Sequence, residues 1–373
     1  MHPTPSISAA KRVVIKIGSS LIADSTSAQL RTAWLATMAE DIAQLHAAGK
    51  EVILVSSGAV ALGRPRVGLG LGALSLEEKQ AAAAAGQPLL IQAWQRAFDA
   101  HGINVAQLLL TLDDTERRRR YLNGRATFAT LLSHRLIPIV NENDTVATAE
   151  LKFGDNDRLA ARVAAMAGAD LLVLFSDIEG LYDKNPHTHA DAKHIPRIES
   201  LTPDMLAMAE GPATAFSNGG MKTKLEAAKI ALDAGCHMAI ASGLADHALQ
   251  QLHAGGKASW FVAGTKPQLA RKHWIASAMH LPGSVVIDDG AAKALAQGKS
   301  LLPAGVKRIE GRFDRGDTVG VKSETDTLLA KGISGFTSEE ATAIAGKKTD
   351  ALASILGYAC RDTLIHRDDL VML

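Results

Sequence analysis

The sequence predicts an α/β sandwich, in which a mainly parallel central sheet lies between two layers of helices, followed by a small β-rich domain. Three observations predict this fold. Five short apolar runs without polar alternation are typical of parallel strands buried on both faces. Ala-rich segments with helical spacing separate these runs. After about residue 265, short β-like pieces separated by Gly and Asp turns follow instead. The chain has 373 residues, 47% of them apolar, which is enough for two domains.

The predicted strands of the larger domain each end in small, polar or charged residues. They are the runs at 13–20, 51–59, 136–144, 170–180 and 238–243. Ligands of open α/β sheets bind outside the carboxyl ends of the strands. We therefore expect the chemistry of this protein at these five strand ends.

The predicted helices occupy 29–48, 80–100, 158–167 and 222–234, and a glycine follows each of them closely. Glycine just past a helix is the expected C-terminal cap. Strand and helix alternate from residue 13 to about 260, which favours a three-layer α/β/α arrangement with a mainly parallel sheet.

The smaller domain is predicted at 281–373, with one helix around 338–345. A mixed segment with no clear period, 266–280, is predicted to link it to a larger domain at 1–265. We found no internal repeat.

Composition excludes several classes of function. Lys and Arg number 40 and Asp and Glu 39, so the chain has no excess charge to attract nucleic acid or an anionic membrane. The start MHPTPSISAA does not resemble a signal peptide, and no apolar run approaches the ~18 residues that span a bilayer. Cys236 and Cys360 are far apart, as expected of two thiols in a reducing compartment. We expect a soluble, cytoplasmic protein.

Two strand ends combine glycine with hydroxyl groups. In VVIKIGSS, Lys16 can neutralise a phosphoryl group, and the backbone at Gly18 and Ser19 can approach it closely. In VSSGAV, Ser57 and Gly58 can present donors to a carboxylate. A strand lysine before an ordinary turn and a serine helix cap are the structural alternatives. The Walker pattern is absent, so this is not a P-loop protein.

Carboxylates and carboxamides gather at two predicted junctions of strand and helix. Asn141 and Asp144 follow one strand, while Asp155, Asn156 and Asp157 open a helix. Aspartate at a helix start is usually only a cap. A cluster of this size can instead bind an ammonium group, orient lysines or hold water around Mg²⁺.

Two further segments suit a nucleotide. Ser176 and Asp177 end another strand, and a β-turn is the alternative interpretation. A glycine pair then runs into a helix that carries two lysines in its first turns, which is typical of an anion site or of a plain solvated helix start. The residues of this second segment are Asn218, Gly219, Gly220, Met221, Lys222, Thr223 and Lys224.

These segments, taken together, resemble the amino acid kinase family. The resemblance rests on VVIKIGSS, VSSGAVALGR, KQAAAAAGQ, VNENDTVAT, FGDNDRLAARVA, SDIEGLY and GGMKTKLEAAKIA, in the family's order. VIDDGA, SLLPAGV, FDRGD and IHRDD in the tail resemble a PUA domain. The combination of a kinase domain of this family with a PUA domain resembles the branch of the family that phosphorylates L-glutamate.

The resemblance implies transfer of a phosphoryl group from ATP, with Mg²⁺, to the γ-carboxylate of L-glutamate, the first step of proline synthesis. It implies that Lys16 and Lys224 contact that group and that Asp155 and Asp157 organise the lysines, the substrate or the magnesium. It implies that glutamate binds to Ser57, Asp144 and Asn156, with Gly58 and Asn141 also at the substrate site. It implies the nucleotide at Ser176, Asp177, Gly219 and Gly220. Ser176 and Asn218 stand where the family often has Thr.

The resemblance also implies a homo-oligomer, with proline as a feedback inhibitor and no metal held by protein ligands alone. Two alternatives are a kinase of another small carboxylate and an RNA-binding or regulatory protein that acts through the PUA domain. Residues 281–373 carry 12 Lys and Arg against 13 Asp and Glu, so nucleic acid is not the expected partner.

Overall fold

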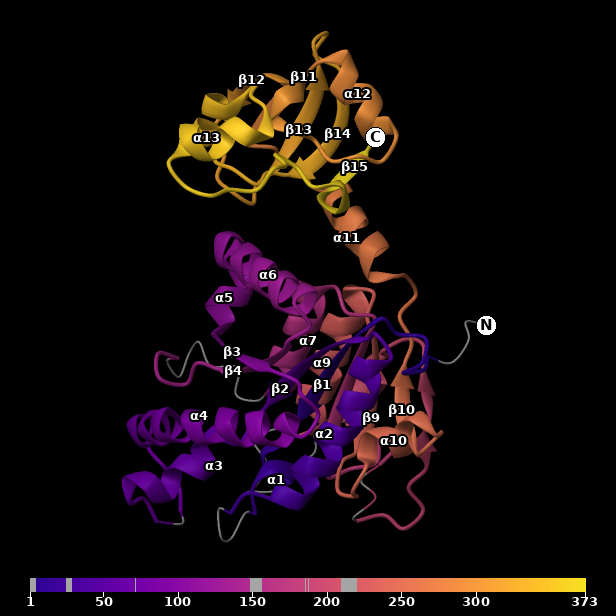
Figure 1. The fold of residues 1–373 in the computed structure, drawn as a ribbon. Helices are drawn as coiled ribbons and strands as arrows, with labels where there is room; N and C mark the ends of the chain where they lie inside the picture. Colours follow the sequence, from indigo (N-terminus) through magenta and orange to yellow (C-terminus); the bar gives the residue numbers. More distant parts are fainter. Residues whose placement is uncertain are drawn as a thin grey trace. The chain divides into compact units, whose positions relative to one another are not determined.

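The computed structural model describes residues 5–24, 29–70, 72–147, 156–184, 186, 188–208 and 220–373. The chain forms two compact units, Met1–Pro267 and Gln268–Leu373 (Figure 1). Each unit has its own apolar core. The two units are therefore described separately.

The described residues of the first unit form an eight-stranded sheet in the order β3-β4-β2-β1-β5-β9-β10-β8. Neighbouring strands run parallel from β3 to β9, and β10 is antiparallel to β9. The carboxyl ends of β4, β2, β1, β5 and β9 thus lie along one edge. The strands are β1 Arg12–Ile17, β2 Glu51–Ser56, β3 Val105–Leu110, β4 Ile137–Glu142, β5 Leu171–Ser176, β8 Arg197–Ile198, β9 His237–Ser242 and β10 Ala258–Phe261, and β6 Leu181–Tyr182 pairs with β7 His194–Ile195.

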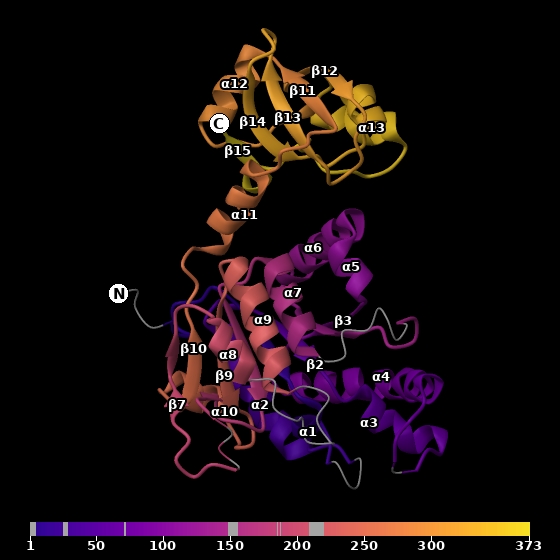
Figure 2. The ribbon, with the colours of Figure 1, turned by 180° about the vertical axis from the view of Figure 1, so that it is seen from behind.

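Helices cover both faces of this sheet, which confirms the predicted sandwich (Figures 1 and 2). Helices α2 and α4 pack on one face, and α6, α7 and α9 pack on the other. The helices are α1 Ser19–Ile22, α2 Thr32–Ala47, α3 Ala59–Gly63, α4 Leu76–Asp99, α5 Leu112–Glu116, α6 Arg118–Ser133, α7 Asn156–Ala167, α8 Pro203–Met208, α9 Met221–Asp233 and α10 Ala248–His253.

The four predicted helices are all present, as α2, α4, α7 and α9. The glycines after them, Gly49, Gly102, Gly168 and Gly235, have φ of 79°, 65°, 65° and 75°. These values lie in the left-handed region that glycine adopts without steric cost, so the caps form as the sequence indicates. The five predicted strands are also present, as β1, β2, β4, β5 and β9. Asn141 was expected to follow its strand but lies inside β4, because the pairing with β3 continues through Asn141 to Glu142.

The strands missed by sequence reasoning lie toward the edges of the sheet. β3 is at one end, and half-buried residues replace the fully buried run seen in the central strands. β8 has two residues and β10 has four. Such short or mixed segments carry too little periodicity to distinguish them from loops.

A close contact between two helices places the start of α3. A Cβ atom at Gly86 of α4 would lie 1.8 Å from the Ala59 carbonyl oxygen, and one at Gly63 of α3 would lie 1.8 Å from that of Ala82. Only glycine fits at either position. The backbones of α3 and α4 therefore touch directly after the turn that ends β2.

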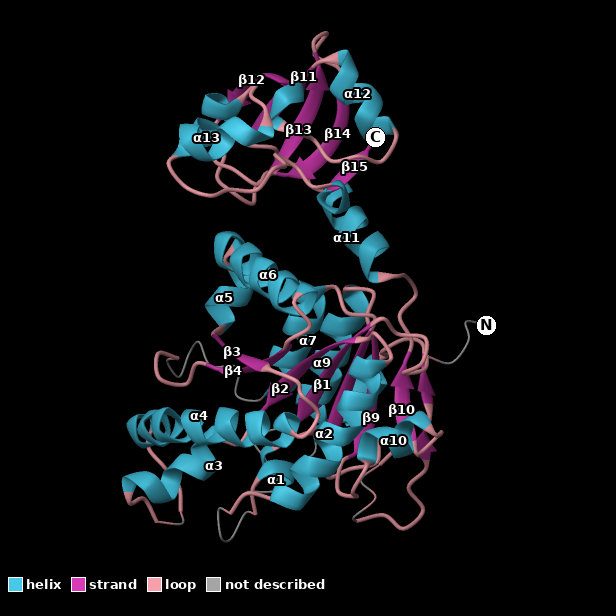
Figure 3. Ribbon diagram, viewed as in Figure 1, coloured by secondary structure: helices cyan, strands magenta, loops and turns pink. Residues whose placement is uncertain are grey.

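The second unit is built on a five-stranded sheet in the order β12-β11-β13-β14-β15 (Figure 3). The predicted helix is present as α13, whereas α12 and α14 were not expected. The predicted linker region contains α11, which Arg271 joins to Asp369 of the same unit at 2.7 Å. The elements are α11 Pro267–Ala276, β11 Gly283–Ile287, α12 Asp289–Ala296, β12 Val306–Gly311, β13 Thr318–Ser323, β14 Leu328–Ile333, α13 Ser338–Ile344, α14 Leu352–Leu356 and β15 Leu370–Met372.

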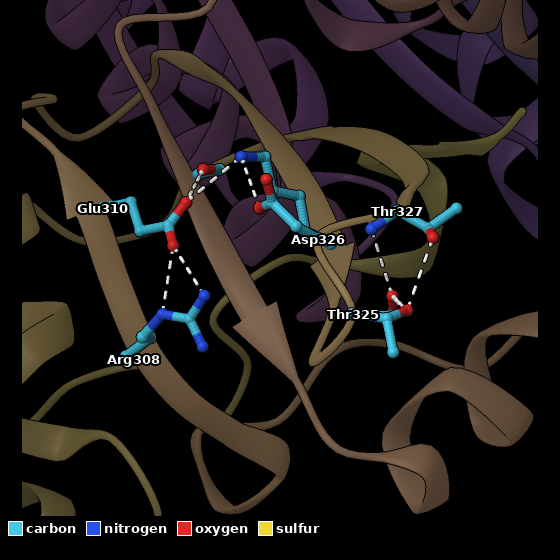
Figure 4. Close-up of polar contacts among 8 residues, drawn as sticks. Arg308, Glu310, Thr325, Asp326 and Thr327 are labelled. Carbon is cyan, nitrogen blue, oxygen red and sulfur yellow. Dashed lines mark hydrogen bonds and ion pairs between the residues drawn. The ribbon is translucent and has the colours of Figure 1, made fainter.

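A network of charged side chains spans three strands of this second sheet, with Glu310 of β12 and Lys322 of β13 in contact across β11 (Figure 4). Glu310 of β12 accepts hydrogen bonds from Ser284 Oγ at 3.0 Å, Arg308 Nε at 3.0 Å and Lys322 Nζ at 3.2 Å. Lys322 Nζ also donates to Asp326 at 2.8 Å. Opposite charges across strands stabilise a sheet modestly. This network accounts for these charges as structural groups.

Candidate active site

A buried carboxylate holds two lysines at the carboxyl end of β1. Asp157 Oδ1 lies 2.5 Å from Lys16 Nζ, and Asp157 Oδ2 accepts a 3.0 Å hydrogen bond from Lys224 Nζ. Thr223 Oγ1 lies 3.4 Å from the same Oδ2. Asp157 is 0% exposed, Lys16 7% and Lys224 3%. Residues from a strand and two helices thus form one cluster, which we call the lysine–aspartate cluster (Lys16, Asp157 and Lys224).

The alternation of side chains along β1 explains why these residues meet. Ile15 packs in the core formed with α2 and α4, whereas Val14 packs in the core formed with α7 and α9. Successive side chains of a strand point to opposite faces, so Lys16 shares the face of Val14. The first turns of α7 and α9 bring Asp157 and Lys224 to that same face.

The cluster carries two positive charges and one negative charge. Burial alone raises the pKa of the Asp157 carboxyl, but the ammonium groups of Lys16 and Lys224 more than offset this effect and hold that pKa below its usual range. Asp157 is therefore ionised at neutral pH, and both lysines share its carboxylate. Within these three residues the positive charges outnumber the negative charge, and in a nearly water-free place they favour an anion such as a phosphoryl group.

A second polar cluster lies next to the first, because Asn156 directly precedes Asp157. Asn156 Nδ2 donates to Ser57 Oγ at 2.7 Å and to Asn141 Oδ1 at 2.8 Å. Asn141 Oδ1 also accepts from the Glu142 amide at 2.9 Å. The Ser57 oxygen accepts in this arrangement, so its own hydrogen can be donated to a carboxylate.

Two glycines shape the approach to these clusters. A Cβ atom at Gly18 would lie 3.9 Å from Lys16 Nζ, so glycine leaves the space beside this ammonium group open. Gly58 has φ of 111°, and a Cβ atom there would lie 3.0 Å from Ile22 Cγ2. The turn after Ser57 therefore requires glycine, and it fixes the direction in which Ser57 points.

Other expected residues lie on the opposite side of β1, at the end of β5 and the start of α9. Ser176 Oγ donates to Asp177 Oδ1 at 2.9 Å. Thr223 Oγ1 donates to the carbonyl of Gly220, the residue before α9, at 2.8 Å. Because β2 and β5 flank β1, Ser57 and Ser176 lie on two sides of Lys16.

The remaining predicted residues are placed as follows. Asp144 is buried near the end of β4, and Ser19 is exposed at the start of α1. Met221 packs against the core under α9, while the side chain of Lys222 is exposed. Asp155, Asn218 and Gly219 lie outside the described residues.

The residues present fit a phosphate better than a bare metal ion. Both oxygens of Asp157 contact lysine ammonium groups. Within the described ranges, no three His, Cys, Asp or Glu side chains are grouped as metal ligands. Magnesium at nucleotide sites is commonly held by one or two carboxylates, waters and the phosphates themselves. We therefore assign no direct magnesium ligand to this chain.

Sequence reasoning missed the residues that support this site from behind. Trp94 of α4 donates from Nε1 to Ser56 Oγ at 2.9 Å, and Trp34 of α2 donates from Nε1 to the Gly243 carbonyl at 2.8 Å. In the sequence, each of the two tryptophans is only an apolar residue in a predicted helix, and nothing there indicates its hydrogen bond. That signal is the same for any core residue.

Comparison with known proteins decides the family. The model of the amino acid kinase family matches residues 11–242, and that of the PUA domain matches residues 283–356. This chain belongs to the amino acid kinase family. The lysine–aspartate cluster and the polar cluster both lie inside the matched region of this amino acid kinase.

Relatives match this amino acid kinase over nearly its whole length. The glutamate 5-kinase of Paramagnetospirillum magneticum is 54% identical, and the alignment covers 98% of this chain and 99% of the relative. Glutamate 5-kinase 1 of Rhizobium meliloti is 54% identical, and the alignment covers 97% of this chain and 92% of the relative. A solved carbamate kinase from Giardia lamblia, bound to AMP-PNP, is 19% identical with a TM-score of 0.49 and covers 69% of this chain and 99% of that chain. Among the described helices, none is long and apolar enough to cross a membrane.

Proposed function

We propose that this kinase transfers the γ-phosphoryl group of ATP to the γ-carboxylate of L-glutamate, giving L-glutamyl 5-phosphate and ADP. The observation that carries the proposal is the adjacency of the two clusters. Asp157 holds the lysines, and Asn156, its neighbour in sequence, binds Ser57 and Asn141. A phosphoryl site thus adjoins a site for a small polar acceptor. The full-length relatives named glutamate 5-kinase support the choice of acceptor.

The chemistry needs no general base. A glutamate γ-carboxylate has a reference pKa near ~4.3, so it is ionised at neutral pH and can attack phosphorus directly. The enzyme must instead overcome repulsion between an anionic nucleophile and an anionic triphosphate. Two buried ammonium groups do this through fixed charge and alignment.

The site residues divide among the phosphoryl group, glutamate and the nucleotide. Lys16 and Lys224 contact the transferring phosphoryl group, and Asp157 holds both of them. Glutamate binds between the polar cluster and Asp144, whose carboxylate suits the α-ammonium group. The assigned glutamate residues are Ser57, Gly58, Asn141, Asp144 and Asn156, and the assigned nucleotide residues are Gly18, Ser19, Ser176, Asp177, Asn218, Gly219, Gly220, Met221, Lys222 and Thr223. Asp155 is assigned the catalytic role of organising the lysines, the substrate or the magnesium together with Asp157.

Magnesium enters with the nucleotide in this proposal. When bound to the triphosphate, it neutralises negative charge there. We also propose that the reaction is the first step of proline synthesis in the cytoplasm, that proline inhibits the enzyme, that the enzyme is a homo-oligomer, and that residues 1–265 and 281–373 are its two domains.

The experiment is an assay in which hydroxylamine traps the acyl phosphate as a hydroxamate. We expect ATP-dependent product with L-glutamate, and much less with L-aspartate or N-acetyl-L-glutamate. N-Acetylation removes the ammonium charge that Asp144 is assigned to bind. Preference for N-acetyl-L-glutamate would overturn the assignment.

A further inference from the structure

Two hydrogen bonds, one buried and one partly buried, link helix α4 to the turn that follows β2. Trp94 Nε1 donates to Ser56 Oγ at 2.9 Å, and Ser56 Oγ donates to the Ser57 carbonyl oxygen at 3.2 Å. Trp94 and Ser56 are both 0% exposed, so water does not compete for the bond between their side chains. We call these two bonds the tryptophan relay (Trp94, Ser56 and the Ser57 carbonyl).

The relay has a direction. An indole N–H only donates, so the Ser56 oxygen accepts and its single hydrogen is left for the Ser57 carbonyl. In a trans peptide, the C=O and the following N–H point in opposite directions. Holding the Ser57 carbonyl toward Ser56 therefore aims the Gly58 N–H away from α4.

Side-chain alternation in β2 places the relay behind the site. Leu54 belongs to the core with α2 and α4, and Ser56 shares its face of the strand, where it meets Trp94. Ser57 points to the other face, where its hydroxyl accepts from Asn156. The Ser57 amide donates to the Ile17 carbonyl at 3.1 Å. The relay thus acts on the Ser57–Gly58 peptide from the side opposite the ligand.

We propose that Trp94 and Ser56 are positioning residues for the acceptor amino acid. They orient the Ser57–Gly58 peptide so that the Gly58 N–H and the Ser57 hydroxyl meet the substrate together. This inference rests on the proposed function, because it assigns the acceptor to that turn. Neither residue touches the substrate itself.

A second tryptophan provides a matched control on the nucleotide side. Trp34 Nε1 donates to the Gly243 carbonyl at 2.8 Å, and the Gly243 amide donates to the Ser176 carbonyl at 2.8 Å. Trp34 is 2% exposed and packs in the same core as Trp94. Loss of its N–H removes an equivalent buried bond without touching the Ser57 turn.

The test compares Trp94→Phe, Ser56→Ala and Trp34→Phe by steady-state kinetics. Loss of one buried hydrogen bond should raise the KM for glutamate about 5- to 30-fold in Trp94→Phe and Ser56→Ala, with the KM for ATP unchanged within about twofold. Trp34→Phe should leave the KM for glutamate unchanged and raise that for ATP. The double variant Ser56→Ala/Trp94→Phe should be no worse than the poorer single variant, since either change breaks the relay.

Several outcomes would overturn the proposal. One is a Trp94→Phe enzyme that melts at a lower temperature but keeps the wild-type KM for glutamate, because the bond would then be structural only. Another is an equal rise of both KM values. If Trp94→Phe does not fold, Ser56→Ala carries the same test. If the wild-type enzyme uses glutamate and the variants have the same KM for it, the positioning role of the relay is wrong but the proposed function stands. If the wild-type enzyme does not use glutamate, the proposed function is wrong as well.

Discussion

Among single residues, Asp157 has the largest influence on the candidate site, because it contacts both lysines. Its two oxygens contact Lys16 and Lys224, and it has no exposed surface. A buried charge without its partner is costly, so the three residues depend on one another. The lysines need Asp157 to remain buried, and Asp157 needs the lysines to remain ionised.

Replacement of Asp157 by Asn should destabilise the fold. The change keeps the shape but removes the negative charge that both buried ammonium groups contact, which should lower the free energy of unfolding at pH 7 by about 3–5 kcal/mol. Urea unfolding measures this difference. The exposed Asp177→Asn is the control, and it should stay near the wild-type value.

The stability difference between the wild type and Asp157→Asn should also depend on pH. The pKa of Asp157 is lowered in the folded state, so its contribution is fully present above the unfolded value of ~3.9 and is lost as the pH falls through the lower folded value. The stability difference between wild type and Asp157→Asn should therefore close below about pH 4. A difference that is the same at pH 7 and pH 3 would contradict the assigned ionisation.

Replacement of either lysine by Met should reduce kcat on the order of 10²–10³-fold, by analogy with the loss of one oxyanion donor. The double variant Lys16→Met/Lys224→Met should lose less than the sum of the two effects, because both lysines act on one developing charge and share Asp157. The KM for glutamate should change little. Steady-state kinetics checks this, with circular dichroism as the test of folding. Near wild-type kcat in either single variant would remove that lysine from the phosphoryl site.

At the scale of elements, the site depends on how strand ends and helix starts are brought together. The contact between α3 and α4 is the tightest example, because α3 begins directly after the Ser57–Gly58 turn. A methyl group at Gly86 has no room beside the Ala59 carbonyl, so α3 must move if one is added. The turn that binds the acceptor would move with it.

Gly86→Ala should therefore lower the free energy of unfolding by about 3 kcal/mol or more, at the upper end of overpacking effects. The KM for glutamate should rise in whatever enzyme folds. Gly70→Ala is the matched control, since a Cβ atom there meets nothing within 4 Å. Thermal melting and kinetics of both variants check the prediction. Equal stability of the two variants would show that α3 and α4 separate easily.

The sequence predicted the central elements well and the peripheral ones poorly, for physical reasons. β1, β2, β4, β5 and β9 are buried on both faces and read as uninterrupted apolar runs. β3, β8 and β10 are short or half-buried and lack that signal. The helix α11 was missed because only Ile275 of its ten residues is buried.

Much of the candidate site could also be anticipated, because strand ends of a parallel sheet converge. Lys16, Ser57, Asn141 and Asn156 were expected near one another on that ground, and their placement agrees. The exact partner of each lysine could not be read from spacing, since α7 and α9 are far apart in sequence. The tryptophan relay could not be read either, because a donor in a helix core has no sequence pattern.

At the scale of the whole molecule, the chain combines a unit that contains the candidate site with a second unit that has its own core. The residues of both clusters lie before Pro267, the last residue of the first unit. The second unit has its own sheet, apolar core and cross-strand charge network. Each unit thus has the features of an independent folding domain.

A chain truncated after Pro267 should fold and keep kinase activity. Its kcat and its KM for both substrates should stay within about threefold of the full chain, since no assigned site residue is removed. Circular dichroism and the hydroxamate assay check this, with the full chain as control. A truncated protein that is folded but inactive would show that the second unit contributes to catalysis.

In the proposed reaction, the γ-carboxylate of glutamate itself attacks the phosphoryl group beside Lys16 and Lys224. The most direct measurement uses L-glutamate with ¹⁸O in both γ-carboxylate oxygens, ATP, and hydroxylamine as the trap. Attack by the carboxylate makes one labelled oxygen the bridge to phosphorus, and hydroxylamine then displaces phosphate by attack at carbon. We predict one ¹⁸O atom in each phosphate released with the hydroxamate. Unlabelled phosphate would mean that water, and not the carboxylate, receives the phosphoryl group, and would contradict this account.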